Sequence, residues 1–446
     1  MVIATGYHPV MTMTAQMTHA IPLCRSGFSL LAACVVSLAA GCASAPVPAP
    51  PTPGGSTDTD AGSVLLISVD ALSPAALDSG WVPNIARLGR EGVRAAWMTP
   101  SYPSLTFPNH YTLVTGLHPE QHGITHNTME DAALGRFRIS DDVATGDARW
   151  WNAAEPLWVT AENAGLPTAA FFWPGSAASI RGVRPRRWHV FDDAVSIETR
   201  VDTVVSWYSE AAATRPRFAT LYFEHLDKAA HDHGPRSTGA REAAGRIDTA
   251  IGRLVDALRV NGVLDSVHIV IVSDHGMAEV PPTQVLSIED MVDPADARPV
   301  TDGQSVGFAP LPGRTGQAEA RLLGAHRGYD CWRKAELPAR WHYRMHPRVP
   351  PIVCQMHEGF DALSAERKAR RKPGVTRGSH GYDPALASMR AVFVARGPRL
   401  RPGATVAGFE NVDVYPLLAR LIGVTPQPNA GDASRFDAVL VGSGER

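Results

Sequence analysis

The run Val64-Leu-Leu-Ile-Ser-Val-Asp70 is a continuous apolar segment of strand length that ends at a carboxylate. Unbroken apolar runs of this kind are typical of parallel strands that are buried on both faces. Comparable runs follow at residues 167–173, 217–223, 267–272 and 389–395. Stretches with helical spacing of apolar residues, such as residues 237–260, lie between them. This alternation predicts an α/β domain with a mostly parallel central sheet flanked by helices.

Composition places few limits on function but excludes some partners. The chain has 446 residues, a formal net charge of −2 and an ordinary apolar content of 44%. A charge this close to zero gives no electrostatic reason to expect binding to nucleic-acid polymers or to membrane surfaces. We expect one main domain over residues 63–446. Within it, residues 280–375 are less regular and rich in Pro, Arg and Glu, which indicates an insertion over one end of the sheet.

The N-terminus has the pattern of a targeting segment. Arg25 precedes an apolar run over residues 28–40, which is too short for a comfortable membrane span. It ends in Leu38-Ala-Ala-Gly-Cys42, which resembles a bacterial lipoprotein cleavage box with Cys42 as the lipidated residue. We therefore expect a signal over residues 1–42, a flexible tether over residues 43–62, and a periplasmic, outer-membrane lipoprotein. The alternative is a secreted protein without a lipid.

Two cysteines remain in the mature chain if Cys42 is lipidated, namely Cys331 and Cys354. An exported chain with two cysteines favours one disulfide, whereas a pair of buried thiols is the alternative.

The stretch Ser101-Tyr-Pro-Ser-Leu-Thr-Phe-Pro-Asn-His110 predicts a helix that begins close to Thr106. Proline is favoured in a first helical turn, and the free N–H groups at a helix N-terminus suit an anion. A threonine hydroxyl is a poor nucleophile unless a base or a metal takes its proton. No base stands beside Thr106 in the sequence, so we looked for metal ligands.

Candidate ligands follow the predicted strands. Asp70, Asp227 and the pair Asp274-His275 lie just past strand ends, the edge at which open α/β sheets bind ligands. His231 is four residues after Asp227, so both can face one ion. His380 stands in the glycine-punctuated loop Arg377-Gly-Ser-His-Gly381. Carboxylates mixed with imidazoles suit Zn²⁺ better than Mg²⁺ or Ca²⁺. Any one of these residues alone would more often be a turn, cap or surface residue.

Together these motifs resemble the nucleotide pyrophosphatase/phosphodiesterase family, of bacterial type, within the alkaline phosphatase superfamily. The resemblance rests on residues 64–70, 106–110, 222–235, 273–277 and 379–383. It implies an alkaline phosphatase-like fold and two Zn²⁺ ions per chain. One ion would be held by Asp227, His231 and His380, and the other by Asp70, Thr106, Asp274 and His275. It also implies that Thr106 is the nucleophile and that Asn127 holds a phosphoryl oxygen.

The expected activity is hydrolysis of nucleotide phosphodiester and pyrophosphate bonds through a threonyl-phosphate, which releases nucleoside 5'-monophosphates. Phe107 and Tyr222, with Trp173, would bind the base or another flat group by stacking, although each ring could simply pack in the core. Two Zn²⁺ ions against three carboxylates and one alkoxide leave a nearly neutral site, which favours a diester over a monoester dianion. The alternatives are a phosphomonoesterase, a hydrolase of phospholipids or phosphonates, and a non-catalytic lipoprotein.

Overall fold

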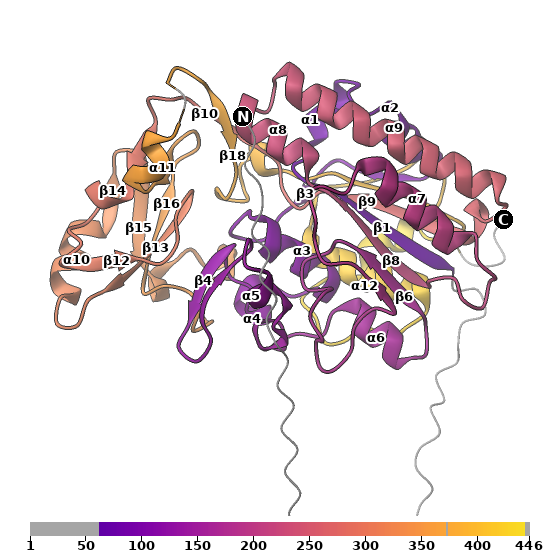
Figure 1. Cartoon of the computed structure of the whole chain (residues 1–446), viewed down its shortest axis with the longest axis horizontal. Helices are drawn as coiled ribbons and strands as arrows, with labels where there is room; N and C mark the ends of the chain where they lie inside the picture. The colour runs from indigo at the N-terminus through magenta and orange to yellow at the C-terminus, as the bar shows by residue number, and fades with distance from the viewer. Residues whose placement is uncertain (1–61, 372, 442–446) are drawn as a thin grey trace, which may run out of the picture. The chain divides into compact units, whose positions relative to one another are not determined.

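The computed structural model describes residues 62–371 and 373–441 (Figure 1). The predicted signal ending at Cys42 and nearly all of the predicted tether lie outside the described residues. Among the residues that the structure does describe, no helix combines the length and apolar character needed to cross a membrane.

An eight-stranded sheet forms the centre of the fold. β1 (Ser63–Val69) pairs in parallel with β8 (Phe218–Phe223) on one side and with β9 (Val267–Val272) on the other. β19 (Phe393–Arg396) is antiparallel to both of its neighbours, so the sheet is mixed, although mostly parallel as predicted. β19 also begins later than expected, because residues 387–389 form a 3₁₀ turn. The outer strands are β20 (Ala404–Val406), β2 (Val93–Ala95), β6 (Thr168–Phe171) and β7 (Arg187–Trp188).

Helices cover both faces of this sheet (Figure 1). Alternate residues of β1 enter two separate hydrophobic cores: Val64 and Leu66 enter one, and Leu65 and Ile67 enter the other. The first core includes α3 (Thr106–Thr115), α6 (Leu157–Asn163) and α12 (Val414–Ile422). The second includes α2 (Pro83–Glu91), α7 (Ile197–Tyr208) and α9 (Thr238–Val260). Burial on both faces explains why β1 reads as an unbroken apolar run.

The predicted insertion contains a five-stranded antiparallel sheet with its own hydrophobic core. Cys331 and Cys354 face each other across two of its strands and form a disulfide, as favoured from the sequence. The strands are β12 (Ala297–Pro299), β13 (Ser305–Pro310), β14 (Gly324–His326), β15 (Tyr329–Arg333) and β16 (Ile352–Met356).

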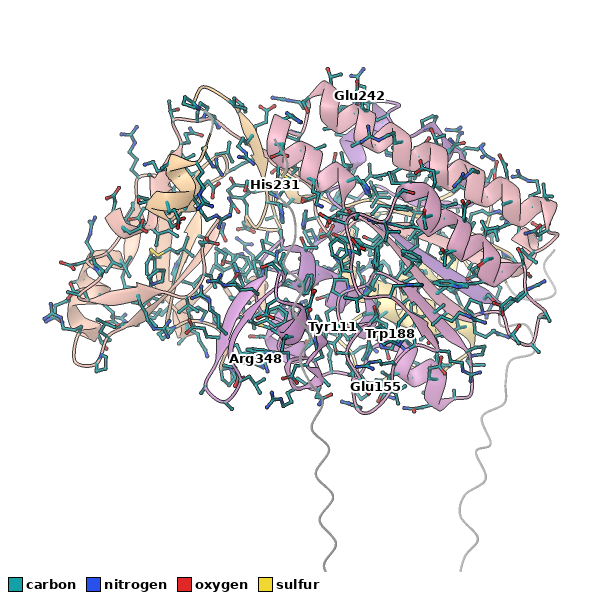
Figure 2. The ribbon with its side chains drawn as sticks, viewed as in Figure 1. Tyr111, Glu155, Trp188, His231, Glu242 and Arg348 are labelled. Carbon is teal, nitrogen blue, oxygen red and sulfur yellow. A yellow bond between two sulfur atoms is a disulfide. The ribbon has the colours of Figure 1, made fainter. Side chains whose placement is uncertain are left out.

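Several contacts connect the insertion to the rest of the domain, including a strand pairing at its base and a buried ion pair. β10 (Ala278–Val280) leaves the central sheet and pairs antiparallel with the returning β18 (Arg377–Ser379), which brings His380 back beside His275. Arg348, labelled in Figure 2, is buried and forms an ion pair with Asp131 at 2.9 Å. Its guanidinium also donates to the carbonyls of Gly123 and Trp150.

Candidate active site

The structure brings the predicted ligands together at the carboxyl edge of the central sheet. Asp70 directly follows β1, and Asp274 with His275 follows β9 after one intervening serine. Asp227 and His231 lie one turn apart on α8 (His225–His233), the helix that begins just after β8. His380 arrives from the end of β18. The site is therefore assembled from segments that are far apart in the sequence.

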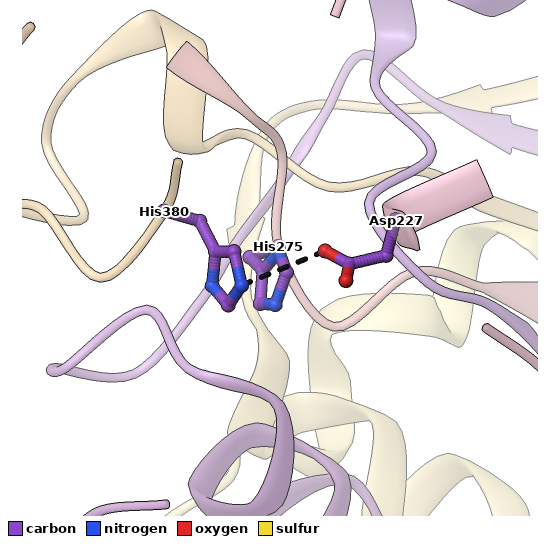
Figure 3. A group of neighbouring side chains, drawn as sticks. All are labelled: Asp227, His275 and His380. Carbon is purple, nitrogen blue, oxygen red and sulfur yellow. Dashed lines mark ion pairs between the residues drawn. The ribbon is translucent and has the colours of Figure 1, made fainter. Parts of the chain in front are cut away.

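Asp227, His231 and His380 form a first cluster. Figure 3 shows two of its members, Asp227 and His380, together with the neighbouring His275. Nε2 of His231 lies 3.4 Å from Oδ2 of Asp227, and Nε2 of His380 lies 3.5 Å from Oδ1. The ring of His275 stacks on that of His380, with 3.6 Å between centroids. Asp227, His275 and His380 each offer a ligand atom within 4.8 Å of the others.

Asp70, Asp274 and His275 form a second cluster, and their ligand atoms also lie within 4.8 Å of one another. Nε2 of His275 lies 3.0 Å from Oδ2 of Asp274 and 3.5 Å from Oδ1 of Asp70. All three side chains are buried. His275, which the sequence resemblance placed with the second ion only, therefore lies within reach of both clusters.

Backbone carbonyls orient the three imidazoles. In each ring Nδ1 lies 2.9 Å from a backbone carbonyl oxygen. The carbonyl belongs to Gly378 for His231, to Gly276 for His275 and to Ser104 for His380. A carbonyl only accepts, so each Nδ1 carries the proton and each Nε2 keeps its lone pair. This arrangement leaves all three Nε2 atoms free to ligate a metal, as in other metal sites.

The atoms left without partners test whether a metal fits. Among the described residues, the buried atoms Oδ1 of Asp70, Oδ1 of Asp227, Oδ2 of Asp274 and Nε2 of His275 have no hydrogen-bond partner. The other oxygen of Asp70 accepts a hydrogen bond from the Tyr222 hydroxyl, and the other oxygen of Asp274 accepts one from the Ala71 N–H. Buried polar groups are normally paired, and unpaired lone pairs that converge on one point are what a cation would satisfy.

The charges lead to the same conclusion. Burial, reinforced by the neighbouring Asp274 and Asp227 carboxylates, raises the pKa of Asp70 well above its ordinary value. Burial also raises the pKa of Asp227. For Asp274 burial acts in the same direction, but the adjacent imidazoles of His275 and His110 outweigh it and lower the pKa. Three carboxylates this close do not all ionise readily without a cation, so the residues present fit a divalent metal centre.

Thr106 is the first residue of α3 and lies beside both clusters. It lines a cavity of about 360 Å³ together with Asp70 and Asp227. The amide oxygen of Asn127 accepts the Phe107 N–H at 3.0 Å, which fixes Asn127 at the start of the helix. This bond uses the Phe107 N–H, which would otherwise be one of the free donors at the helix start. The Asn127 amide nitrogen is the end that remains to donate.

The same cavity is aromatic on its other side, and we call it the aromatic cavity. Phe107, Trp173 and Tyr222, the three rings predicted to bind substrate, all line it. Trp173 is nearly buried, and its indole N–H donates to the carbonyl of His110. Tyr222 is also nearly buried, and its hydroxyl donates to Asp70. Trp173 and Tyr222 therefore both line the cavity and form hydrogen bonds that hold the surrounding structure.

Some residues at the site were not predicted from the sequence. The cavity wall includes Phe172, Trp188 and Phe191, in a segment that carries no periodic signal beyond its aromatic content. The buried Arg200 binds Glu224 at 2.6 Å and the carbonyl of Tyr222 at 3.0 Å, and it fixes the end of β8. A lone Arg on a helix gives no sequence signal for such a role.

His110 contacts several parts of the site. Its ring is buried, with Nε2 at 2.8 Å from the Ser68 hydroxyl and Nδ1 at 2.8 Å from the Thr106 carbonyl. The same Nδ1 lies 3.5 Å from Oδ2 of Asp274. His110 thus connects β1, the first turn of α3 and one ligand.

Comparison with known proteins identifies the class. The family described as type I phosphodiesterase / nucleotide pyrophosphatase matches residues 64–383. The chain belongs to this family of enzymes. It is 31% identical over 390 residues to the bis(5'-adenosyl)-triphosphatase of Xenopus laevis, covering 86% of this chain and 83% of the relative. It is 30% identical over 376 residues to human ectonucleotide pyrophosphatase/phosphodiesterase family member 5, covering 84% and 77%.

A solved structure confirms the fold. The murine ectonucleotide pyrophosphatase/phosphodiesterase 5, studied as an inactive threonine-to-alanine variant in complex with AMP, superposes with a TM-score of 0.79 at 30% identity. The match covers 85% of this chain and 100% of the murine chain. The predicted alkaline phosphatase-like α/β fold is therefore confirmed. These relatives are animal proteins, so the bacterial type stays a prediction.

Proposed function

We propose that this enzyme is a two-metal hydrolase that cleaves nucleotide phosphodiester and pyrophosphate bonds and releases nucleoside 5'-monophosphates. One observation carries the proposal: the Thr106 hydroxyl lies in one cavity with ligands of both clusters, next to a wall of aromatic rings. A nucleophile, a cation site and a surface for a flat group are thus adjacent.

For the metals we propose two Zn²⁺ ions per chain. Asp227, His231 and His380 would hold one. Asp70, Thr106, Asp274 and His275 would hold the other, with His275 near both. Mixed imidazole and carboxylate ligands support zinc over magnesium or calcium. Bound there, the metals would supply charge stabilisation at the attacking and departing oxygens.

The chain's own residues account for the remaining steps. The Thr106 oxygen forms a bond to phosphorus while the bond from phosphorus to the departing oxygen breaks. A water molecule then displaces Thr106, which regains its proton, and the nucleoside monophosphate leaves. The Asn127 amide nitrogen is placed to donate to an equatorial phosphoryl oxygen, where negative charge builds up.

A diester is favoured over a monoester because the cations around the site already have partners. Lys228 and Arg184 line the aromatic cavity with Thr106, but an ion pair and a ring contact already occupy them. Arg377, three residues before His380, is another cation close to the metal ligands. In the structure its guanidinium donates to the carbonyl of His231 and to the carboxylate of Asp232. The test is a parallel assay of p-nitrophenyl thymidine 5'-phosphate and p-nitrophenyl phosphate. Faster hydrolysis of the monoester would overturn the proposal in favour of a phosphomonoesterase.

A nucleotide is favoured over a phospholipid or a phosphonate by the aromatic cavity and by the relatives. The Xenopus relative is named for a nucleotide substrate, and the murine structure contains AMP. We expect Phe107→Ala to lower kcat/KM for the nucleotide diester by about 5- to 100-fold, because base stacking is worth roughly 1–3 kcal/mol. A small alkyl p-nitrophenyl phosphodiester has no base and should lose far less. Equal losses on both would count against base binding.

We further propose that Cys42 anchors the enzyme to the bacterial outer membrane through a lipid. The support for this anchor is the sequence before Cys42, which resembles a lipoprotein cleavage box. Cys42→Ser should then move the enzyme from the membrane fraction to the soluble periplasmic fraction. A variant that stays with the membranes would contradict this anchor.

A further inference from the structure

A second cavity, of about 570 Å³, is lined by other predicted metal ligands than the aromatic cavity is. His231, His380 and Asn127 line it, and so do residues of the insertion from β17 (Asp361–Leu363) and α11 (Ala365–Ala369). Thr106 and the aromatic rings do not line it. We call it the arginine-lined cavity.

Cations outnumber anions in the wall of this cavity. It contains four guanidinium groups, those of Arg367, Arg370, Arg371 and Arg377. Only two carboxylates, Asp302 and Asp361, line the same space. A surplus of guanidinium groups in a concave site attracts phosphate or carboxylate.

The guanidinium groups have acidic partners but keep donors to spare. Arg367 pairs with Asp302, Arg371 with Asp361, and Arg370 with Glu366 outside the cavity wall. Each of these three side chains uses one of its five N–H donors in the hydrogen bond that results. The remaining donors can bind an anionic ligand without breaking the existing pairs.

Two buried donors in the wall also lack a partner within the part of the chain that the structure describes. Nδ1 of His126 accepts the N–H of Thr128 at 3.0 Å, so the proton of the neutral ring is on Nε2, which has no partner. Nε2 of Gln304 is unpaired as well. Both side chains are 4% exposed and line the cavity. One unpaired acceptor, Oδ1 of Asp361, is also there, but the other oxygen of that carboxylate binds Arg371. The wall therefore offers mainly donors.

The position of the cavity relative to Thr106 gives it a role. In a displacement at phosphorus the leaving group departs opposite the attacking oxygen. Thr106 lines the aromatic cavity, whereas His231 and His380, which would hold the ion that does not bind Thr106, line the arginine-lined one. We propose that the arginine-lined cavity binds the phosphate groups of the leaving group, as pyrophosphate or as the distal part of a dinucleoside polyphosphate. This inference rests on the proposed nucleotide hydrolysis and adds a preference for polyphosphate substrates.

The test compares substrates whose leaving groups differ in charge. ATP, ADP and p-nitrophenyl thymidine 5'-phosphate would release pyrophosphate, phosphate and nitrophenolate. The variant is Arg367→Gln with Arg370→Gln, because these side chains are exposed and their partners are solvated. Arg371 and Arg377 are left intact, since they hold a buried carboxylate and the His231 carbonyl. The matched control, Arg314→Gln with Arg321→Gln, removes the same charge from the insertion away from the cavity.

We expect kcat/KM of the variant to fall at least about ten-fold for ATP, less for ADP and least for the nitrophenyl ester, since charge-assisted hydrogen bonds are lost in that order. The control should match the wild type on all three. Equal losses on the three substrates, or an unchanged rate on ATP, would overturn the inference while leaving the proposed function standing. A wild type that hydrolyses none of the three would overturn the proposed function itself, and this inference with it. Each single variant gives the same comparison if the double variant does not fold.

Discussion

The hydroxyl of Tyr222 donates a 2.6 Å hydrogen bond to Oδ2 of Asp70. One side chain therefore forms part of the aromatic cavity and also orients a carboxylate of the proposed metal centre. The sequence predicted only the first of these roles. An alanine at this position would remove the ring and the bond together, so it cannot separate stacking from support of the metal centre.

Tyr222→Phe isolates the bond. We expect kcat/KM to fall by about 10- to 100-fold for a nucleotide diester and by the same factor for a small alkyl p-nitrophenyl phosphodiester, because a hydrogen bond to a charged group is worth roughly 1.5–3 kcal/mol. Steady-state kinetics on the two substrates measures this. A loss confined to the nucleotide substrate would mean that the hydroxyl acts on the base and not through Asp70.

Thr106→Ala should abolish turnover while the metal content stays close to that of the wild type. The hydroxyl is the only nucleophile at the start of α3, whereas the unpaired carboxylate and imidazole atoms remain to hold the cations. Initial rates and metal analysis on the same preparation give both results. Thr106→Ser, which keeps a hydroxyl, should retain measurable activity. Turnover by the Ala variant at the wild-type rate would exclude a covalent threonyl-phosphate.

His231→Ala should lower the zinc content from about two to about one equivalent per chain, because an incomplete set of ligands binds weakly. His233→Ala is the matched control. It removes another imidazole from the same helix, and that imidazole is exposed and lies outside both clusters. Elemental analysis after dialysis distinguishes the two variants. Full zinc content in both would show that His231 is not a ligand.

Replacing both Cys331 and Cys354 with Ser should lower the free energy of unfolding by about 3 kcal/mol, the chain-entropy value for a loop of this length. The two cysteines are 23 positions apart on neighbouring strands. Thermal melts with and without a reducing agent test this. The agent should destabilise the wild type and leave the Ser variant unaffected, and a wild type insensitive to reduction would refute the expectation.

Much of the site could be predicted because β1, β8 and β9 are buried on both faces and end in polar residues. That pattern alone predicts that Asp70, Asp227 and Asp274 lie at one edge of the sheet. It could not show how closely the side chains meet. The approach of His275 to both clusters depends on the loop after β9 and on the return of β18, which are long-range features.

The arginine-lined cavity could not be predicted from sequence patterns, because it also depends on long-range contacts. Arg367 and Arg371 lie in an irregular, charged stretch that reads as ordinary solvated surface. These side chains form part of a site only because the folded chain places them in one cavity wall with His231 and His380. The antiparallel sheet of the insertion was also missed, since its short strands carry no clear alternation.

The order of the ligands along the chain also affects how the enzyme is made. Asp70 ends the first strand, whereas His380 follows the whole insertion. A growing polypeptide therefore lacks one ligand of the first cluster until synthesis has passed the insertion and β18 has paired with β10. Fragments that end earlier cannot complete that cluster, so the full set of ligands forms only after the insertion has been synthesised.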